Sequence, residues 1–302
     1  MQHRPTIVGL GEVLWDLLPA GKQLGGAPAN FAYHAGALGA HARLVSRVGR
    51  DALGDETLDQ LARLGVPTDG VEVDPRLPTG TVSVVVAADG QPQFTIHENV
   101  AWDALEGSPA GRQAIATADA LCFGTLAQRS ERSRSTIRAL VAAVPAGALR
   151  VFDVNLRQHF YSRAVIEESL AMADVVKVND AELPRLGEML GLPGNDRSQI
   201  AALADRFGLR GVVCTRGAQG SLLHAEGRWS ERPGIPTRVV DTIGAGDSFT
   251  AALTLGLLAG WPLDEVHRRA GDLAAYVCSQ PGATPFLPES LTAPFRSAWE
   301  RE

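Results

Sequence analysis

Between residues 120 and 217 the sequence reads ALCFG (120–124), LRVFDVN (149–155), VVKVN (175–179) and GVVCTRG (211–217), four apolar runs separated by longer segments. Such runs are typical of strands in a parallel sheet that is covered on both faces. Two similar runs lie nearer the N-terminus, TIVGLGEV at 6–13 and ARLVSRVG at 42–49. Helical spacing of Leu, Ile, Val and Ala marks the segments 54–64, 131–143 and 198–208. We therefore expect an α/β fold with a mainly parallel central sheet wrapped by helices.

One region departs from this pattern. From Gly70 to Ala101 apolar and polar residues alternate, Asp89-Gly90 marks a turn, and there is no room for a helix. We expect antiparallel strands here, which would form a small sheet with a second candidate strand at 12–18 and stand off the main domain as a lid. An antiparallel edge on the main sheet is the alternative. The expected organisation is one domain, 1–302, with a lid from about 12–24 and 70–101.

Composition excludes several classes of protein. The chain has 302 residues, of which 45% are apolar and 21% are charged, as in ordinary globular proteins. Its 28 basic and 34 acidic residues give a net charge of −6, and the basic residues are scattered, which disfavours nucleic-acid binding. No N-terminal signal sequence or membrane-spanning run is visible, so we expect a cytoplasmic protein without a membrane partner. Cys122, Cys214 and Cys278 are far apart and without metal-ligand spacing, so we expect free thiols.

The segment VDTIGAGDSFTAAL at 240–253 could carry chemistry. Its glycines allow a tight turn whose amide groups face outward where a helix begins, at about Asp247. Such a turn binds anions and suits the charge that develops on a transferring phosphoryl group. The Asp247 carboxylate beside it could accept a hydroxyl proton. A plain helix N-cap is the alternative for Asp247.

A second glycine-containing segment, LGGAPANFAYHAGALGA, occupies residues 24–40. Gly25 and Gly26 directly precede a predicted helix and would let the backbone approach a ligand. Asn30 in the first turn has both donor and acceptor atoms, which suit a polyol hydroxyl. A capping role for Asn30 is the alternative.

With both segments present, the chain resembles the PfkB carbohydrate kinase family, also called the ribokinase-like kinases. The resemblance spans nearly the whole chain and includes RVGRDALGDE (47–56), FDVNLR (152–157), VKVNDAEL (176–183) and CTRGAQGSLL (214–223). GEVLWDLLP (11–19), TGTVSVVV (79–86), HENVAWD (97–103) and FGTLAQR (123–129) are most similar to bacterial and plant fructokinases. The resemblance implies a ribokinase-like three-layer α/β/α fold and transfer of the γ-phosphate of ATP to a primary sugar hydroxyl, with fructose as the leading substrate and Mg²⁺ as cofactor.

The resemblance also implies roles for individual residues. On the sugar side it implies hydroxyl contacts or close backbone approach at Asp16, Gly25, Gly26 and Asn30, a sugar or phosphate contact at Arg157, an anion hole at Gly244, Ala245 and Gly246, and the catalytic base at Asp247. An ordinary surface ion pair is the alternative for Arg157. Ala27 stands where ribokinases tend to carry Lys, which disfavours ribose.

On the nucleotide side, the resemblance implies that Asn179 and Glu182 place Mg²⁺ and the phosphates through water, and that the nucleotide loop contains Thr215, Gly217 and Gly220. An ordinary helix start and a strand-ending turn are the alternatives. A monovalent cation, K⁺, is implied at Asp241, Ile243, Val277, Gln280 and Gly282, mainly through carbonyl oxygens.

Other functions remain as alternatives. A Rossmann dehydrogenase would need a third glycine at Leu14, and no P-loop motif occurs in the sequence. A non-catalytic sugar-binding module could use Asp16 and Asn30 but has no need of an anion hole beside a carboxylate. Within the family, 2-keto-3-deoxygluconate, ribose, tagatose 6-phosphate and nucleosides are alternative substrates. Exposed lid strands could pair between two subunits of a homodimer.

Overall fold

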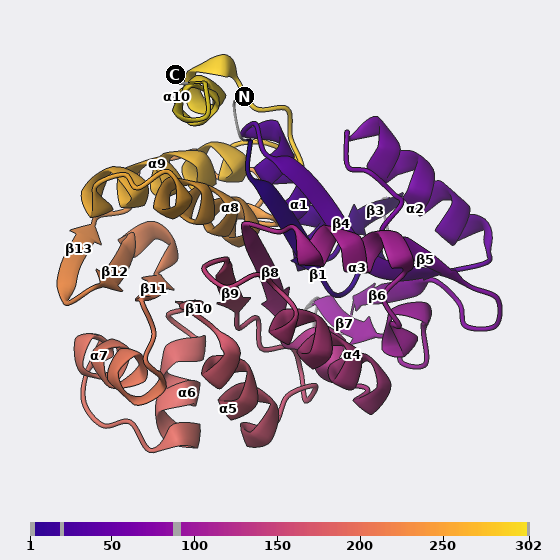
Figure 1. Cartoon of the computed structure of the whole chain (residues 1–302), viewed down its shortest axis with the longest axis horizontal. Helices are drawn as coiled ribbons and strands as arrows, with labels where there is room; N and C mark the ends of the chain where they lie inside the picture. The colour runs from indigo at the N-terminus through magenta and orange to yellow at the C-terminus, as the bar shows by residue number, and fades with distance from the viewer. Residues whose placement is uncertain (1–3, 19–20, 87–91, 301–302) are drawn as a thin grey trace.

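A nine-stranded sheet runs through the centre of the molecule (Figure 1), in a computed structural model that describes residues 4–18, 21–86 and 92–300. Its strand order is β13-β12-β11-β10-β9-β8-β1-β4-β5. Every neighbouring pair from β11 to β5 is parallel, and β12 and β13 add an antiparallel edge. The strands are β1 (Thr6–Leu10), β4 (His41–Gly49), β5 (Val71–Asp74), β8 (Ala120–Gly124), β9 (Leu149–Asp153), β10 (Val175–Asn179), β11 (Gly211–Thr215), β12 (Ser221–Ala225) and β13 (Arg228–Arg232).

Helices cover both faces of this sheet, which confirms the predicted three-layer architecture. One face packs against α1 (Ala27–Ala37), α2 (Ala52–Arg63), α8 (Ala245–Leu258), α9 (Leu263–Cys278) and α10 (Glu289–Ala298). The other packs against α3 (Pro109–Ala116), α4 (Glu131–Ala142), α5 (Arg163–Met172), α6 (Glu182–Leu190) and α7 (Asp196–Phe207). The predicted helical segments correspond to α2, α4 and α7.

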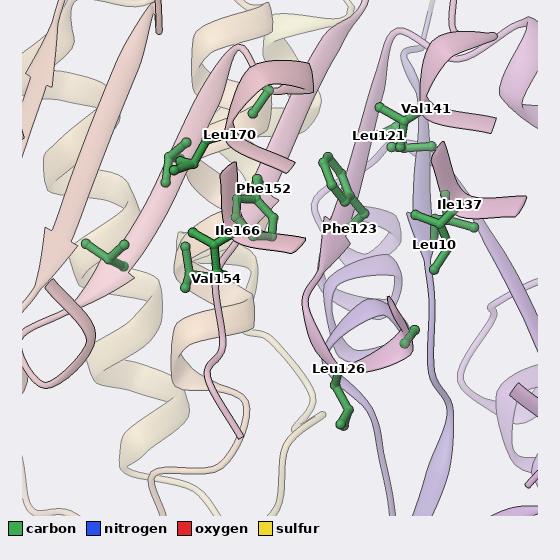
Figure 2. Packing of buried hydrophobic residues seen from close by; sticks show 14 of the residues in the cluster. Leu10, Leu121, Phe123, Leu126, Ile137, Val141, Phe152, Val154, Ile166 and Leu170 are labelled. Atoms are coloured by element: carbon green, nitrogen blue, oxygen red, sulfur yellow. The ribbon is translucent and has the colours of Figure 1, made fainter. Parts of the chain in front are cut away.

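The apolar runs form strands because both of their faces are buried. Every residue of β8 is buried, and the Phe123 ring stacks on Phe152 of β9 with 5.2 Å between the ring centroids. Figure 2 shows Ile166 of α5 near Phe152 and Ile137 of α4 next to Leu10 of β1, and these helix residues close this face of the sheet. Complete burial of large apolar side chains is the main favourable contribution to the stability of such a core.

A second sheet, in the order β3-β2-β6-β7, is separate from the central one. Its strands are β2 (Leu14–Leu18), β3 (Gly21–Gly25), β6 (Gly80–Val86) and β7 (Pro92–Ile96). The predicted small sheet therefore exists, and its strands β6 and β7 pair antiparallel, as expected for this region, while β2 joins β6 in parallel. One detail was wrong, because β5, placed in the lid by the range 70–101, pairs with β4 in the main sheet. The expected turn at Asp89-Gly90 lies outside the described residues.

Two further expectations concern the cysteines and membrane spans. All three cysteines are free, as predicted, and Cys122 and Cys214 are buried. Within the described ranges, none of the helices combines the length and the apolar character that crossing a bilayer requires.

Candidate active site

The two glycine-containing segments meet at the N-termini of α1 and α8. Gly26 precedes α1 with a φ of 111°, and a Cβ there would lie 2.6 Å from the Glu12 carbonyl oxygen. Gly244 precedes α8 with a φ of 76°, and a Cβ there would lie 2.4 Å from the Ala283 carbonyl oxygen. Only glycine fits such positions, because any side chain would meet backbone atoms in a conformation that L-residues avoid. Each glycine thus fixes the start of a helix against another segment.

The side chains of Asn30 and Asp247 join these helices. Asn30 Nδ2 donates a hydrogen bond of 2.8 Å to Asp247 Oδ2, across 217 residues of sequence. Neither side chain caps its helix, because the N-cap residues are Gly26 and Gly244 and neither helix has a side-chain cap bond. The capping alternatives for both residues are therefore excluded. The helix also begins at Ala245, two residues earlier than expected.

Asp247 is partly buried and keeps some access to solvent. Burial, followed by the negative charge of Asp153, raises its pKa from 3.8 to about 6. The Asn30 hydrogen bond and the cations Lys177 and Arg157 oppose this rise. At neutral pH the group is therefore mostly ionised but close to titration, as suits a general base.

The turn Gly244-Ala245-Gly246 contributes the first amide groups of α8. The first N–H groups of an α-helix have no partner within the helix, so they can face an anion. The Ala245 N–H makes only a weak local bond of 3.4 Å to the Thr242 carbonyl oxygen. The turn thus has the chemistry predicted for an anion hole, directly beside the Asp247 carboxylate.

Asp16, Gly25 and Arg157 gather on the side of the small sheet. A Cβ on Gly25 would lie 2.8 Å from Asp16 Oδ2, so the carboxyl lies directly over the glycine. Burial raises the pKa of Asp16, and the nearby Arg157 guanidinium opposes the rise. Arg157 also acts electrostatically on Glu12 and Asp247. Within the described residues it has no ion pair within 4.0 Å, so the surface ion-pair alternative lacks support.

Glu12 is a site residue that the sequence reasoning missed. Its side chain is buried, its Oε2 atom has no hydrogen-bond partner among the described residues, and it lies near Ala27, Arg157 and Asp247. Burial raises its pKa from 4.5 to about 7. A glutamate that directly follows a buried strand, in GLGEV, was the available signal, since Glu is rarely buried without a special reason.

Lys177 and Asp153 were also missed as site residues. Lys177 Nζ lies 3.0 Å from Asp153 Oδ1, and each side chain is only 5% exposed. Asp153 Oδ2 accepts a hydrogen bond of 3.0 Å from Thr250 Oγ1 in α8. The signal was a charge inside each of two apolar runs, VVKVN and LRVFDVN.

The Asn179 and Glu182 pair begins helix α6 through reciprocal hydrogen bonds. Asn179 Oδ1 accepts from the Glu182 N–H, and Glu182 Oε2 accepts from the Asn179 N–H, each at 2.9 Å. Glu182 Oε1 accepts from the Leu156 N–H at 3.0 Å. This is the helix-start arrangement that was the alternative for the motif. In the described residues, no three His, Cys, Asp or Glu side chains form a group that could hold a metal. Binding through water suits Mg²⁺ here, because Mg²⁺ keeps several of its waters and one lone pair of each Glu182 oxygen is already used.

The predicted nucleotide loop lies beside this motif, because Asn179 pairs with Thr215 in the sheet and the Asp180 N–H donates to the Thr215 carbonyl oxygen at 2.9 Å. Its two glycines differ. A Cβ on Gly217 would meet open space, whereas one on Gly220 would lie 2.0 Å from the Arg232 carbonyl oxygen. Gly217 thus leaves room for a ligand, and Gly220 allows a close backbone crossing.

The two segments predicted to hold a monovalent cation are brought together by Asp241. Its Oδ1 accepts from the Ile243 N–H at 3.0 Å, and its Oδ2 accepts from the Gly282 N–H at 3.1 Å. The Val277 carbonyl oxygen accepts from the Gln280 N–H at 3.0 Å. These bonds bring the two predicted loops together, and a cation between them stays a prediction.

Comparisons with known proteins agree with this arrangement. The family described as pfkB family carbohydrate kinase matches residues 20–290. A fructokinase from Klebsiella pneumoniae is 33% identical over 278 residues, which cover 88% of each chain. An uncharacterized sugar kinase from Pyrococcus horikoshii superposes with a TM-score of 0.82 at 27% identity, over 97% of this chain and 98% of that chain. A fructokinase from Vibrio cholerae, solved with fructose, ADP and a calcium ion, gives 0.79 at 26% identity over 95% and 97%.

The family match covers most of the chain and includes both glycine-containing segments. The fold and the pairing of Asn30 with Asp247 agree with it. The chain belongs to the pfkB family of carbohydrate kinases.

Proposed function

We propose that the chain transfers the γ-phosphate of ATP to the primary 6-hydroxyl of D-fructose, with Asp247 as the catalytic base. The observation that carries this proposal is the 2.8 Å bond from Asn30 to Asp247 at the start of α8. It joins a side chain suited to sugar hydroxyls to a carboxylate beside an anion-binding turn. A protein that only binds a neutral sugar does not need this combination.

The chemical step follows from this geometry. Asp247 takes the hydroxyl proton as the sugar oxygen attacks phosphorus, a P–O bond forms, and the bond to the ADP oxygen breaks. Asn30 orients the carboxylate, and Asp16 and Arg157 contact the sugar. The Gly244, Ala245 and Gly246 amides face the charge on the transferring group.

ATP would supply the phosphoryl group, and Mg²⁺ would neutralise its charge. Asn179 and Glu182 would hold the metal through water, beside Thr215 and Gly217 in the nucleotide loop. K⁺ would lie between the loops at 241–243 and 277–282. Fructokinases among the relatives favour fructose over 2-keto-3-deoxygluconate, ribose or a nucleoside.

A sugar panel tests the proposal. ADP release should be measured with MgATP and with fructose, ribose, 2-keto-3-deoxygluconate, tagatose 6-phosphate and adenosine, and fructose should give the highest kcat/KM. A higher kcat/KM with another sugar would overturn the choice of fructose. Binding of fructose without turnover of any substrate would favour the sugar-binding module.

The role of Asp247 has its own test. Asp247→Asn keeps the shape of the side chain but removes the base, so kcat should fall by about 10² to 10⁴. Asp272→Asn is the matched control, because this carboxylate pairs with Arg268 on helix α9 outside the site. Near-normal kcat in Asp247→Asn would overturn the assignment.

A further inference from the structure

The buried ion pair of Lys177 and Asp153 lies directly behind the proposed anion hole. Lys177 Nζ would be 2.8 Å from a Cβ on Gly246, so the ammonium group touches the turn that begins α8. Asp153 reaches the same helix through Thr250, whose Oγ1 lies 3.0 Å from Asp153 Oδ2 and 2.9 Å from the Gly246 carbonyl oxygen. Lys177 therefore contacts the start of α8 at Gly246, and Asp153 is bonded to the same helix at Thr250.

Burying this ion pair costs free energy of folding, so its presence needs a functional explanation. Both side chains are removed from solvent, and burial opposes the charged form of each. Hydrophobic residues of similar volume could occupy these two positions of β9 and β10 without a desolvation cost. The 3.0 Å contact with the Asp153 carboxylate favours the charged form of Lys177.

We propose that Lys177 and Asp153 are positioning residues of the kinase site: together they fix the first turn of α8, and Lys177 places a positive charge behind the Gly244–Gly246 turn. The proposal rests on the proposed function of that turn and of Asp247. It assigns the two charges opposite effects on the Asp247 carboxylate, since Lys177 favours its ionised form and Asp153 disfavours it.

Other groups also act on Asp247, and the test must hold them constant. The charged or titratable neighbours of its carboxyl are Glu12 after β1, Cys122 on β8, Asp153 on β9, Arg157 in the loop after β9, and Lys177 on β10. Substitutions at Lys177 and Asp153 leave the other three in place. Opposite shifts of the Asp247 titration midpoint in the two variants can therefore be attributed to Lys177 and Asp153.

The experiment compares Lys177→Met, Asp153→Asn and the double variant in the intact protein. The Asp247 titration is followed by carboxyl ¹³C NMR and assigned with Asp247→Asn, so this readout does not require activity. The midpoint should rise by about one pH unit in Lys177→Met, the usual effect of losing a neighbouring opposite charge. It should fall in Asp153→Asn and return toward the wild-type value in the double variant.

Kinetics provide a second readout. In Lys177→Met, kcat on the alkaline plateau should fall about tenfold or more, because a charge aimed at the reacting group is lost, whereas the KM for sugar should change little. Thr254→Val is the control, because Thr254 is buried one turn further along α8 and its hydroxyl bonds only to the Thr250 carbonyl oxygen among the described residues. It should move neither the midpoint nor kcat.

The outcomes separate the inference from the proposed function. Midpoints that do not move in the folded single variants, or that move in the same direction, would overturn the inference. If Lys177→Met unfolds because Asp153 is left unpaired, Asp153→Asn and the double variant still give the signed comparison. Opposite shifts in a protein without kinase activity on any sugar would support the charge arrangement and reject the proposed function.

Discussion

Replacing Asp247 by Asn should stabilise the protein while it abolishes most of its activity. Burial and Asp153 raise the pKa of this carboxyl in the folded protein from 3.8 to about 6. The folded protein therefore holds the proton more tightly than the unfolded chain does, and folding loses stability as the pH rises between these two values. A difference of about two units corresponds to about 3 kcal/mol above pH 7, and Asn avoids this cost.

The stability gained by Asp247→Asn should increase with pH. Below pH 3.8 the carboxyl is protonated in both states, so Asp and Asn should give similar stability. Above pH 7 the full cost is present, so the advantage of Asp247→Asn should grow by about 1 kcal/mol between pH 5 and pH 8. Urea unfolding of both proteins at several pH values measures the difference.

The result that would refute this reasoning is a variant that is no more stable than the wild type at pH 8. Asp272→Asn again serves as the control, since it loses an exposed ion pair and should change stability by less than about 1 kcal/mol at every pH. A gain in both variants would indicate a general effect of lowering the negative charge. A stable variant with low kcat would place Asp247 among residues retained for activity at a cost in stability.

Three further predictions follow from the same contacts. Asn30→Ala removes the hydrogen bond that holds down the Asp247 pKa, so the acidic limb of kcat/KM should move upward by about one pH unit, and an unmoved limb would contradict the assigned contact. Gly220→Ala should lose about 2 kcal/mol more stability in thermal unfolding than Gly217→Ala, because only the first would strike backbone; equal losses would contradict this. Asp241→Ala should abolish any K⁺ stimulation of kcat, and full stimulation in this variant would exclude the loops at 241–243 and 277–282 as the cation site.

Much of the fold could be predicted from the sequence because its signals are local. The strands β1, β4, β8, β9, β10 and β11 of the central sheet lie in the apolar runs of the sequence, and α2, α4 and α7 show helical spacing. The sheet to which β5 belongs could not be predicted in this way. Its sequence, VEVD, alternates in the same manner as the strands of the small sheet, and only its pairing with β4 places it in the central sheet. Pairing is a long-range property that alternation does not specify.

The site shows the same division between local and long-range information. Each glycine-containing segment could be recognised alone, but a helix cap remained an alternative for Asn30 and for Asp247 until the bond between the two side chains was seen. For the Asn179 and Glu182 motif the structure shows the local hydrogen bonds of a helix start, so its proposed role toward Mg²⁺ rests on the resemblance and not on a tertiary contact. Local sequence therefore identified where side chains could act, and tertiary contacts decided which of them are free to act.

The buried charges extend this point to residues that lie inside the quoted motifs but to which the sequence assigned no role. Glu12, Asp153 and Lys177 each lie in or directly after a buried strand, where an apolar residue would cost less. Asp153 is the last residue of β9, Glu12 follows β1 after Gly11, and Lys177 pairs with Asp153 from the middle of β10, so all three lie toward the carboxyl edge of the parallel sheet, where ligands of α/β proteins bind. A charge inside an apolar run is thus evidence for a site when several such charges converge on one edge, because a stable core alone gives no reason to bury them together.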